Sequence, residues 1–123
     1  MNPGTDTVKA LAFGRLAIGA VALLFPRLAA RLFLLDIRRN PQLSYMTRLF
    51  AAREIAIGTV SLAAPEDART PLLGLGIAVD GADAFAGVAA ARSGVVSKPA
   101  GAMVTVAALG AVAAGAAALA GRR

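Results

Sequence analysis

Four long apolar stretches, separated by short polar segments, set the pattern of this chain. They cover residues 9–26, 43–64, 71–91 and 100–120. A transmembrane helix needs about 20 consecutive and mostly apolar residues, and each stretch is close to that length. Hydrophobic residues make up 58% of the chain, and the mean hydropathy is +0.69, so it is more apolar than an ordinary soluble domain. The pattern predicts an all-α fold in which residues 1–123 form one integral membrane domain, a bundle of four transmembrane helices.

The first stretch also has the outline of a signal peptide, because Lys9 precedes an apolar run. Arg15 interrupts that run, which is atypical of the apolar region of a signal peptide. We therefore interpret residues 9–26 as an uncleaved first span.

Six charged side chains lie at membrane depth in three of the four predicted spans, and their formal charges sum to zero. An isolated charge at the centre of a bilayer costs at least ~2.5 kcal/mol, so such residues turn inward and pair. We expect a buried intramembrane charge network made of Arg15, Arg48, Arg53, Glu54, Asp80 and Asp83.

Helix geometry suggests which of these charges meet. At a rise of 1.5 Å per residue from each predicted helix entry, Arg53 and Asp80 reach a similar depth, and so do Arg48 and Asp83. Those two pairs are the predicted ion pairs of neighbouring antiparallel helices. Arg15 lies within reach of either Glu54 or Asp80.

Small and weakly polar residues recur on one face of each later helix, as they do where membrane helices pack closely. The third helix is predicted to begin at Pro71, with Thr70 as its N-cap. The fourth span has no charged residue, and we interpret it as packing surface. The predicted packing faces are Thr47, Ala51, Glu54, Gly58 and Ser61; Gly76, Asp80, Asp83, Ala84 and Gly87; and Gly110, Ala114, Ala117 and Gly121.

The connector after the first span alternates basic and leucine positions. Its spacing fits a short amphipathic helix in the membrane interface, with leucines toward the acyl chains and arginines toward lipid head groups. The alternative is a continuation of the first helix followed by a solvated connector. The leucines are Leu28, Leu32 and Leu35, and the expected head-group contacts are Arg27, Arg31, Arg38 and Arg39.

The chain carries a net charge of +6, and the excess lies in loops and tails, which makes lipid head groups the expected partner and not nucleic acid. Basic residues are more numerous in the connectors after the first and third spans, which favours termini outside the cell under the positive-inside rule. Arginine, alanine and glycine dominate, a bias typical of GC-rich bacterial genomes. We expect a multi-pass protein of the bacterial plasma membrane.

Catalysis is not expected. The chain has no cysteine and no histidine, so it lacks thiolate chemistry, the usual zinc ligands and the usual base at neutral pH. Residues 80–84 resemble the opening of the CDP-alcohol phosphotransferase motif, but Phe85 stands where that motif has arginine, and no later aspartate follows Asp83. We therefore predict no enzymatic activity, no cofactor and no metal.

Three segments resemble a family of small four-helix membrane proteins of actinobacteria, similar in style to the DoxX-like group. The segments are residues 14–19, 48–54 and 79–83. The resemblance implies an accessory or scaffolding subunit of a larger envelope assembly, including lipid-import complexes of mycobacterial type, with other membrane subunits or its own copies as partners. The alternative is a small oligomeric transporter or channel that uses Glu54, Asp80 and Asp83 for coupling, and a water-filled cavity that reaches these carboxylates would favour it.

Overall fold

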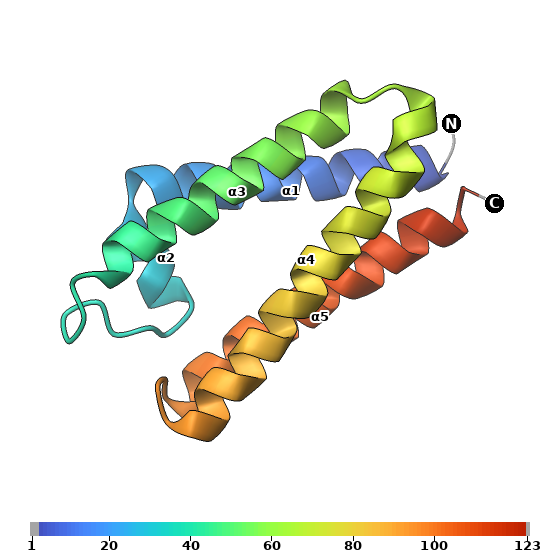
Figure 1. Ribbon diagram of the computed structural model, residues 1–123. Helices are drawn as coiled ribbons and strands as arrows, with labels where there is room; N and C mark the ends of the chain where they lie inside the picture. Colours follow the sequence, from blue (N-terminus) through green and yellow to red (C-terminus); the bar gives the residue numbers. More distant parts are fainter. Residues whose placement is uncertain (1–2, 123) are drawn as a thin grey trace.

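The computed structural model describes residues 3–122, which fold into helices joined by short connectors (Figure 1). The predicted all-α fold is confirmed, since no strand occurs in that range. The helices are α1 (Pro3–Leu24), α2 (Pro26–Leu32), α3 (Leu43–Ala63), α4 (Glu66–Ser93) and α5 (Lys98–Ala120).

The long helices pair as two antiparallel hairpins. Helix α1 packs along α3, and α4 packs along α5, whereas α3 and α4 touch only slightly despite being consecutive. A smaller contact between α1 and α5 joins the hairpins. Figure 1 shows them converging at the end that holds both termini and diverging toward the end that holds α2. The fold is thus a V of two hairpins.

Glycines permit the close approach within each hairpin. A Cβ placed on Gly58 of α3 would lie 2.9 Å from the carbonyl oxygen of Ala12 in α1. A Cβ on Gly101 of α5 would lie 2.4 Å from the Cβ of Ala91 in α4. Small residues at helix contacts are typical of membrane proteins, in which association depends on close packing because lipid is as apolar as the side chains.

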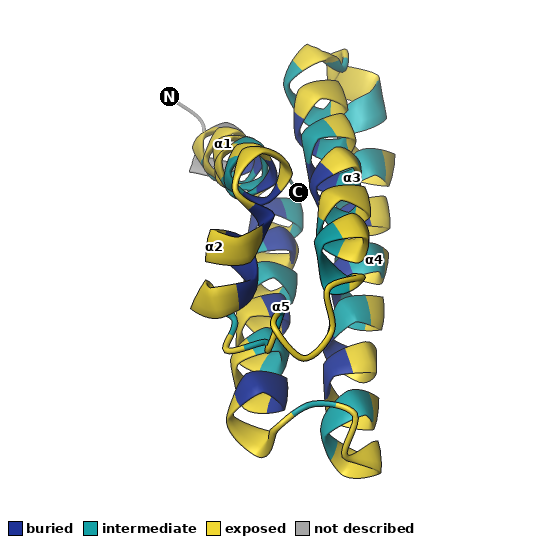
Figure 2. Ribbon diagram, turned by 90° about the vertical axis from the view of Figure 1, so that its left-hand side faces the viewer, coloured by how far each residue is buried: buried dark blue, intermediate teal, exposed yellow. Residues whose placement is uncertain are grey.

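The interior is built almost entirely from alanine. Among the described residues, the buried apolar side chains are alanines apart from Val8 and Pro26, and no large side chain is fully buried. The large apolar side chains face outward instead, with Phe85 76% exposed and Phe13 59% exposed. Figure 2 shows exposed positions in general along the outer sides of the helices. Such an arrangement suits a hydrocarbon solvent, which accepts exposed large apolar side chains.

Within residues 3–122, three helical segments are long and apolar enough to cross a membrane, namely Asp6–Leu24, Glu66–Ser93 and Lys98–Ala120. Helix α3 is not among them, and it carries three charged residues, Arg48, Arg53 and Glu54. The fourth span therefore stays a prediction.

Helix α4 begins earlier than the sequence pattern indicated. It starts at Glu66, so Pro71 lies inside the helix, and Thr70 is not its N-cap. Pro65 takes the N-cap position in an extended conformation, and Glu66 and Asp67 occupy the first turn. Carboxylates there interact favourably with the positive end of the helix dipole. One missing N–H at Pro71 does not prevent the extra turn from forming.

The packing faces of α3 and α4 are as predicted, but that of α5 is not. Ala51, Glu54 and Gly58 are buried on α3. The buried residues of α5 are Ala100, Gly101, Ala108, Gly115 and Ala118. The predicted stripe of Gly110, Ala114, Ala117 and Gly121 is exposed except at Ala114, which is half-buried.

The connector after α1 forms a shorter helix than the amphipathic pattern predicted. Pro26 disfavours a helical conformation at the preceding residue, and Phe25 accordingly separates α1 from α2 with φ −132°. Helix α2 ends at Leu32, and Leu34 adopts a positive φ of 63°. Leu28 and Leu32 are exposed, whereas Leu35 is half-buried. Contact of this segment with the membrane interface stays a prediction.

Candidate functional site: an ion network at the end of a cavity

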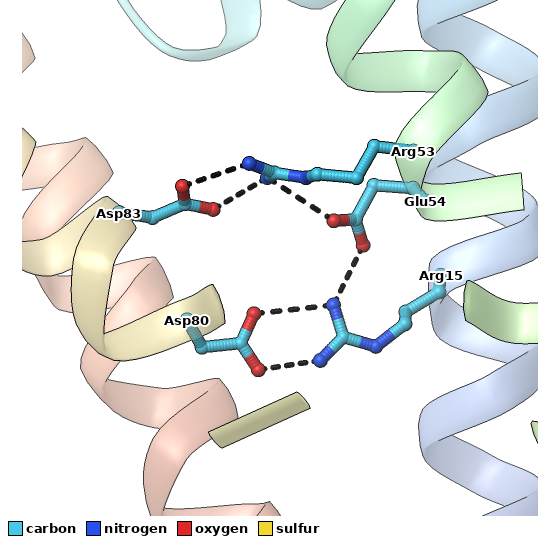
Figure 3. A network of polar contacts seen from close by, with 5 residues as sticks. All are labelled: Arg15, Arg53, Glu54, Asp80 and Asp83. Carbon is cyan, nitrogen blue, oxygen red and sulfur yellow. Dashed lines mark hydrogen bonds and ion pairs between the residues drawn. The ribbon is translucent and has the colours of Figure 1, made fainter. Parts of the chain in front are cut away.

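Five charged side chains from three helices meet between the hairpins, near the middle of the long helices. Arg15 comes from α1, Arg53 and Glu54 come from α3, and Asp80 and Asp83 come from α4. Figure 3 shows the two aspartates of α4 facing the arginines across the gap between the hairpins. The network therefore bridges α3 and α4, which make few other contacts.

Arg15 holds the most buried part of the network. Its guanidinium binds Asp80 through two hydrogen bonds, Nη1 to Oδ1 at 3.1 Å and Nη2 to Oδ2 at 2.5 Å. Nη1 also donates to Oε2 of Glu54 at 2.9 Å. Glu54 and Asp80 are the two buried acidic residues of the described chain. Since the fork of donors matches a carboxylate, this bidentate pair fixes the position of α1 against α4.

Arg53 makes the corresponding outer pair. It binds Asp83 through Nη1 at 3.1 Å and Nη2 at 2.6 Å, and Nη2 also donates to Oε1 of Glu54 at 3.3 Å. Its guanidinium carbon lies 5.1 Å from the centre of the Phe50 ring, a cation–π distance. Glu54 thus accepts from both arginines and links the two pairs.

The pairing differs from the predicted one. Arg53 binds Asp83 and not Asp80, and Asp80 is held by Arg15. Arg48 is exposed and lies outside the network, where its Nε donates to the carbonyl oxygen of Leu23 in α1 at 3.2 Å. The structure thus brings together five of the six predicted side chains. The reason is that α3 packs mainly against α1, so Arg48 faces the end of α1 and not α4.

Without Arg48, the network is not neutral. It contains two guanidiniums and three carboxylates, so its formal net charge is −1 when all five groups are ionised. Asp83 is the carboxylate with the most accessible side chain, 28% exposed against 5% for Glu54. Among the three carboxylates, Asp83 is therefore the one that a ligand can reach most easily.

A cavity of about 620 Å³ opens between the hairpins and reaches the network. Glu54, Asp80, Asp83 and Arg15 line one part of it, and the remaining lining is mostly apolar. The connector after α2 contributes Phe33 and Leu35, and the first half of α3 contributes Met46 and Phe50. Helix α5 contributes Val104 and several alanines. Ligand sites in proteins have volumes of roughly 300–1,000 Å³, mostly apolar linings and a few polar groups, as this one has.

A second, smaller cavity adjoins the network. Its volume of about 20 Å³ is close to that of one water molecule. Leu11, Arg15, Asp80 and Ala111 line both cavities. The Arg15–Asp80 pair thus borders both cavities.

Oxygen atoms of the three carboxylates come close enough to consider a metal. One oxygen each from Glu54, Asp80 and Asp83 lies within 4.8 Å of the other two. Two arginines already donate to these carboxylates, however, and a metal ion would have to compete with their guanidiniums. The arrangement is first of all an ion-pair network.

Sequence reasoning missed the cavity, and it placed Gly76 on a packing face without its contact to the Arg15 guanidinium. Gly76 of α4 lies beside the Arg15 guanidinium, and a Cβ there would be 3.2 Å from Nη2. Its position four residues before Asp80 on the same helical face is the signal that could have indicated this role. The apolar lining has no comparable sequence signal.

The chain was compared with protein-family models, with curated proteins and with solved structures, and none of them matches. The function must therefore be argued from the fold and the site alone.

Proposed function

We propose that the protein is a small multi-pass membrane transporter that takes a hydrophobic solute into the cavity between its hairpins. The observation that carries this proposal is the cavity of about 620 Å³ that reaches Glu54, Asp80 and Asp83. A network that served only to fix helix register would not need a ligand-sized space beside it.

Binding can be tested with a tryptophan placed in the cavity, because the natural chain contains none. Phe33 lines the cavity, so Phe33→Trp reports on its contents. Phe13, on the exposed outer side of α1, provides the control reporter Phe13→Trp. The probe is the neutral dye diphenylhexatriene, which accepts energy from tryptophan. Energy transfer falls steeply with distance, so we expect saturable quenching to be stronger at position 33 than at position 13, beside a gradual, non-saturating component at both positions.

A cavity-filling substitution tests whether that binding occupies the cavity. Ala107 lines it, and Ala107→Phe should abolish saturable quenching at position 33. Ala113, an exposed residue of the same helix outside the cavity lining, gives the matched control Ala113→Phe, which should leave quenching unchanged. Equal quenching at positions 33 and 13 of the reporter variants would count against the proposal.

The proposed arrangement has four spans, with α3 as the fourth. Helix α3 has 21 residues, about 31 Å of helix, which is enough to cross the hydrocarbon core. Two of its three charges, Arg53 and Glu54, are held in the network.

Single cysteines can test whether α3 crosses the membrane, because the natural chain has no cysteine. With an impermeant maleimide, Asp36→Cys and Val95→Cys should react from one side of the membrane, and Asp67→Cys from the other. Labelling of positions 36 and 67 from one side would exclude α3 as a span.

An accessory subunit is the second candidate function, and exposed glycines favour it. Gly110 on α5 and Gly74 on α4 are exposed and have no atom within 4 Å of an added Cβ. A partner helix could approach these positions closely. The test is extraction in mild detergent through an affinity tag, followed by mass spectrometry. Stoichiometric recovery of one larger membrane assembly, including a lipid-import complex, would support this role, whereas a lone oligomer would favour the transporter.

A further inference from the structure

We propose that the solute accepted by the cavity is a hydrophobic cation with a single positive charge. This inference rests on the proposed function and adds the substrate class. It follows from the charge of the network, from the identity of the residues that line the cavity and from the apolar character of the rest of the lining.

The cavity wall is more negative than the network as a whole. Three carboxylates line the cavity, Glu54, Asp80 and Asp83, but Arg15 is the one basic residue in the lining. Arg53 belongs to the network but not to the cavity lining, and its guanidinium binds Asp83 and lies over the Phe50 ring. A solute in the cavity therefore meets an excess of negative charge.

A low-dielectric surrounding makes that excess important. The interaction between unit charges is several times stronger at an effective dielectric constant near 20 than in water. One uncompensated carboxylate attracts one positive charge, and a neutral or anionic solute gains nothing from it. Charge complementarity thus favours a monovalent cation over an isosteric anion.

The apolar lining decides which kind of cation fits. Beyond the four charged residues, Thr7 and Thr47 are the polar side chains in the lining. A small inorganic ion would lose its hydration shell without finding enough oxygen ligands, since both buried carboxylates already accept hydrogen bonds from Arg15. An organic cation replaces water contacts with contacts to Phe33, Leu35 and Met46 and places its charge toward Asp83.

The test uses two ions of nearly identical shape and opposite charge, tetraphenylphosphonium and tetraphenylborate. Each is titrated into the Phe33→Trp protein holding diphenylhexatriene, and displacement is read as recovery of tryptophan emission. The Phe13→Trp protein corrects for partition of each ion into the micelle. We expect the cation to displace the dye at a concentration at least about tenfold lower than the anion.

Variants of the network then change its charge in both directions. Asp83→Asn brings the formal net charge to zero, and Arg53→Gln brings it to −2. Cation affinity should fall in Asp83→Asn and rise in Arg53→Gln. The double variant has a net charge of −1, so its cation affinity should return toward that of the natural protein. Asp67→Asn removes an exposed carboxylate from the first turn of α4, away from the cavity, and should change nothing. Should Asp83→Asn fail to fold, the rise expected for Arg53→Gln still tests the proposal.

The outcomes separate this inference from the function on which it rests. Preference for the cation, with affinity following the charge of the network, supports both. Equal or tighter binding of the anion, with saturable dye binding intact, overturns the cation inference and leaves the transporter proposal standing. If neither the dye nor either ion shows saturable binding at position 33, both proposals fail.

Discussion

Replacing Arg15 by methionine should be the most destabilising single change in the network. Methionine keeps an unbranched side chain but removes all three hydrogen bonds to Glu54 and Asp80. Asp80 then becomes a buried carboxylate without a cationic partner. Breaking a buried ion pair by removing one member typically costs 3–5 kcal/mol, and we expect Arg15→Met to fall within that range.

A double-mutant cycle separates the Arg15–Asp80 pair from other effects of each substitution. Asp80→Asn removes the negative charge at nearly constant volume, and the double variant leaves neither charge unpaired. We expect an interaction free energy of about 2 kcal/mol, within the range for residues in direct contact. The measurement is reversible unfolding in mixed micelles at rising fractions of sodium dodecyl sulfate, followed by far-ultraviolet circular dichroism.

The matched control is a cycle on Arg48 and Asp83, which the sequence paired but the structure separates. Arg48→Met and Asp83→Asn should be additive to within about 0.5 kcal/mol, because Arg48 binds a carbonyl oxygen of α1 instead. Additivity in the Arg15–Asp80 cycle, or strong coupling in the Arg48–Asp83 cycle, would refute the pairing described here.

Two further predictions concern the support of the network and the closed end of the V. Gly76→Val should displace the Arg15 guanidinium and destabilise the fold by about 1–3 kcal/mol, as measured by the same unfolding in mixed micelles. Its control, Gly81→Val, has open space around it and should be tolerated. Arg122→Ala removes hydrogen bonds from the end of α5 to Glu66, whose side chain is 69% exposed, so we expect a loss of at most about 1 kcal/mol that shrinks at high salt.

The sequence sufficed for the helical class and for two of the packing faces. Glu54 and Gly58 recur at helical spacing with other small residues, and larger side chains occupy the opposite side of α3, so the contrast identifies the inner face. Helix α5 offers no such contrast, because alanine and glycine occur all round it. The residue types of α5 therefore do not distinguish one face from another. Its buried face is determined by its contacts with α4 and α1.

The ion pairs could not be derived from depth alone. Placing the start of α4 at Pro71 when it begins at Glu66 moves Asp80 by about 7.5 Å along the helix axis. The depth argument also assumed that consecutive spans are packed neighbours, whereas α3 packs with α1. Helix pairing depends on close contacts between residues far apart in sequence, such as Gly58 with Ala12. The spacing of residues within one helix does not indicate which other helix it will contact.

The V shape gives the chain unequal width along the membrane normal. The hairpins meet where Ala64 and Pro65 join α3 to α4 and where Arg122 binds Glu66, and they spread apart toward the end that holds α2 (Figure 1). In the proposed four-span arrangement, the protein therefore occupies more area in one leaflet than in the other. A wedge of this kind is accommodated most easily where the bilayer bends away from its wider end, so local membrane curvature would influence where in the cell the protein accumulates.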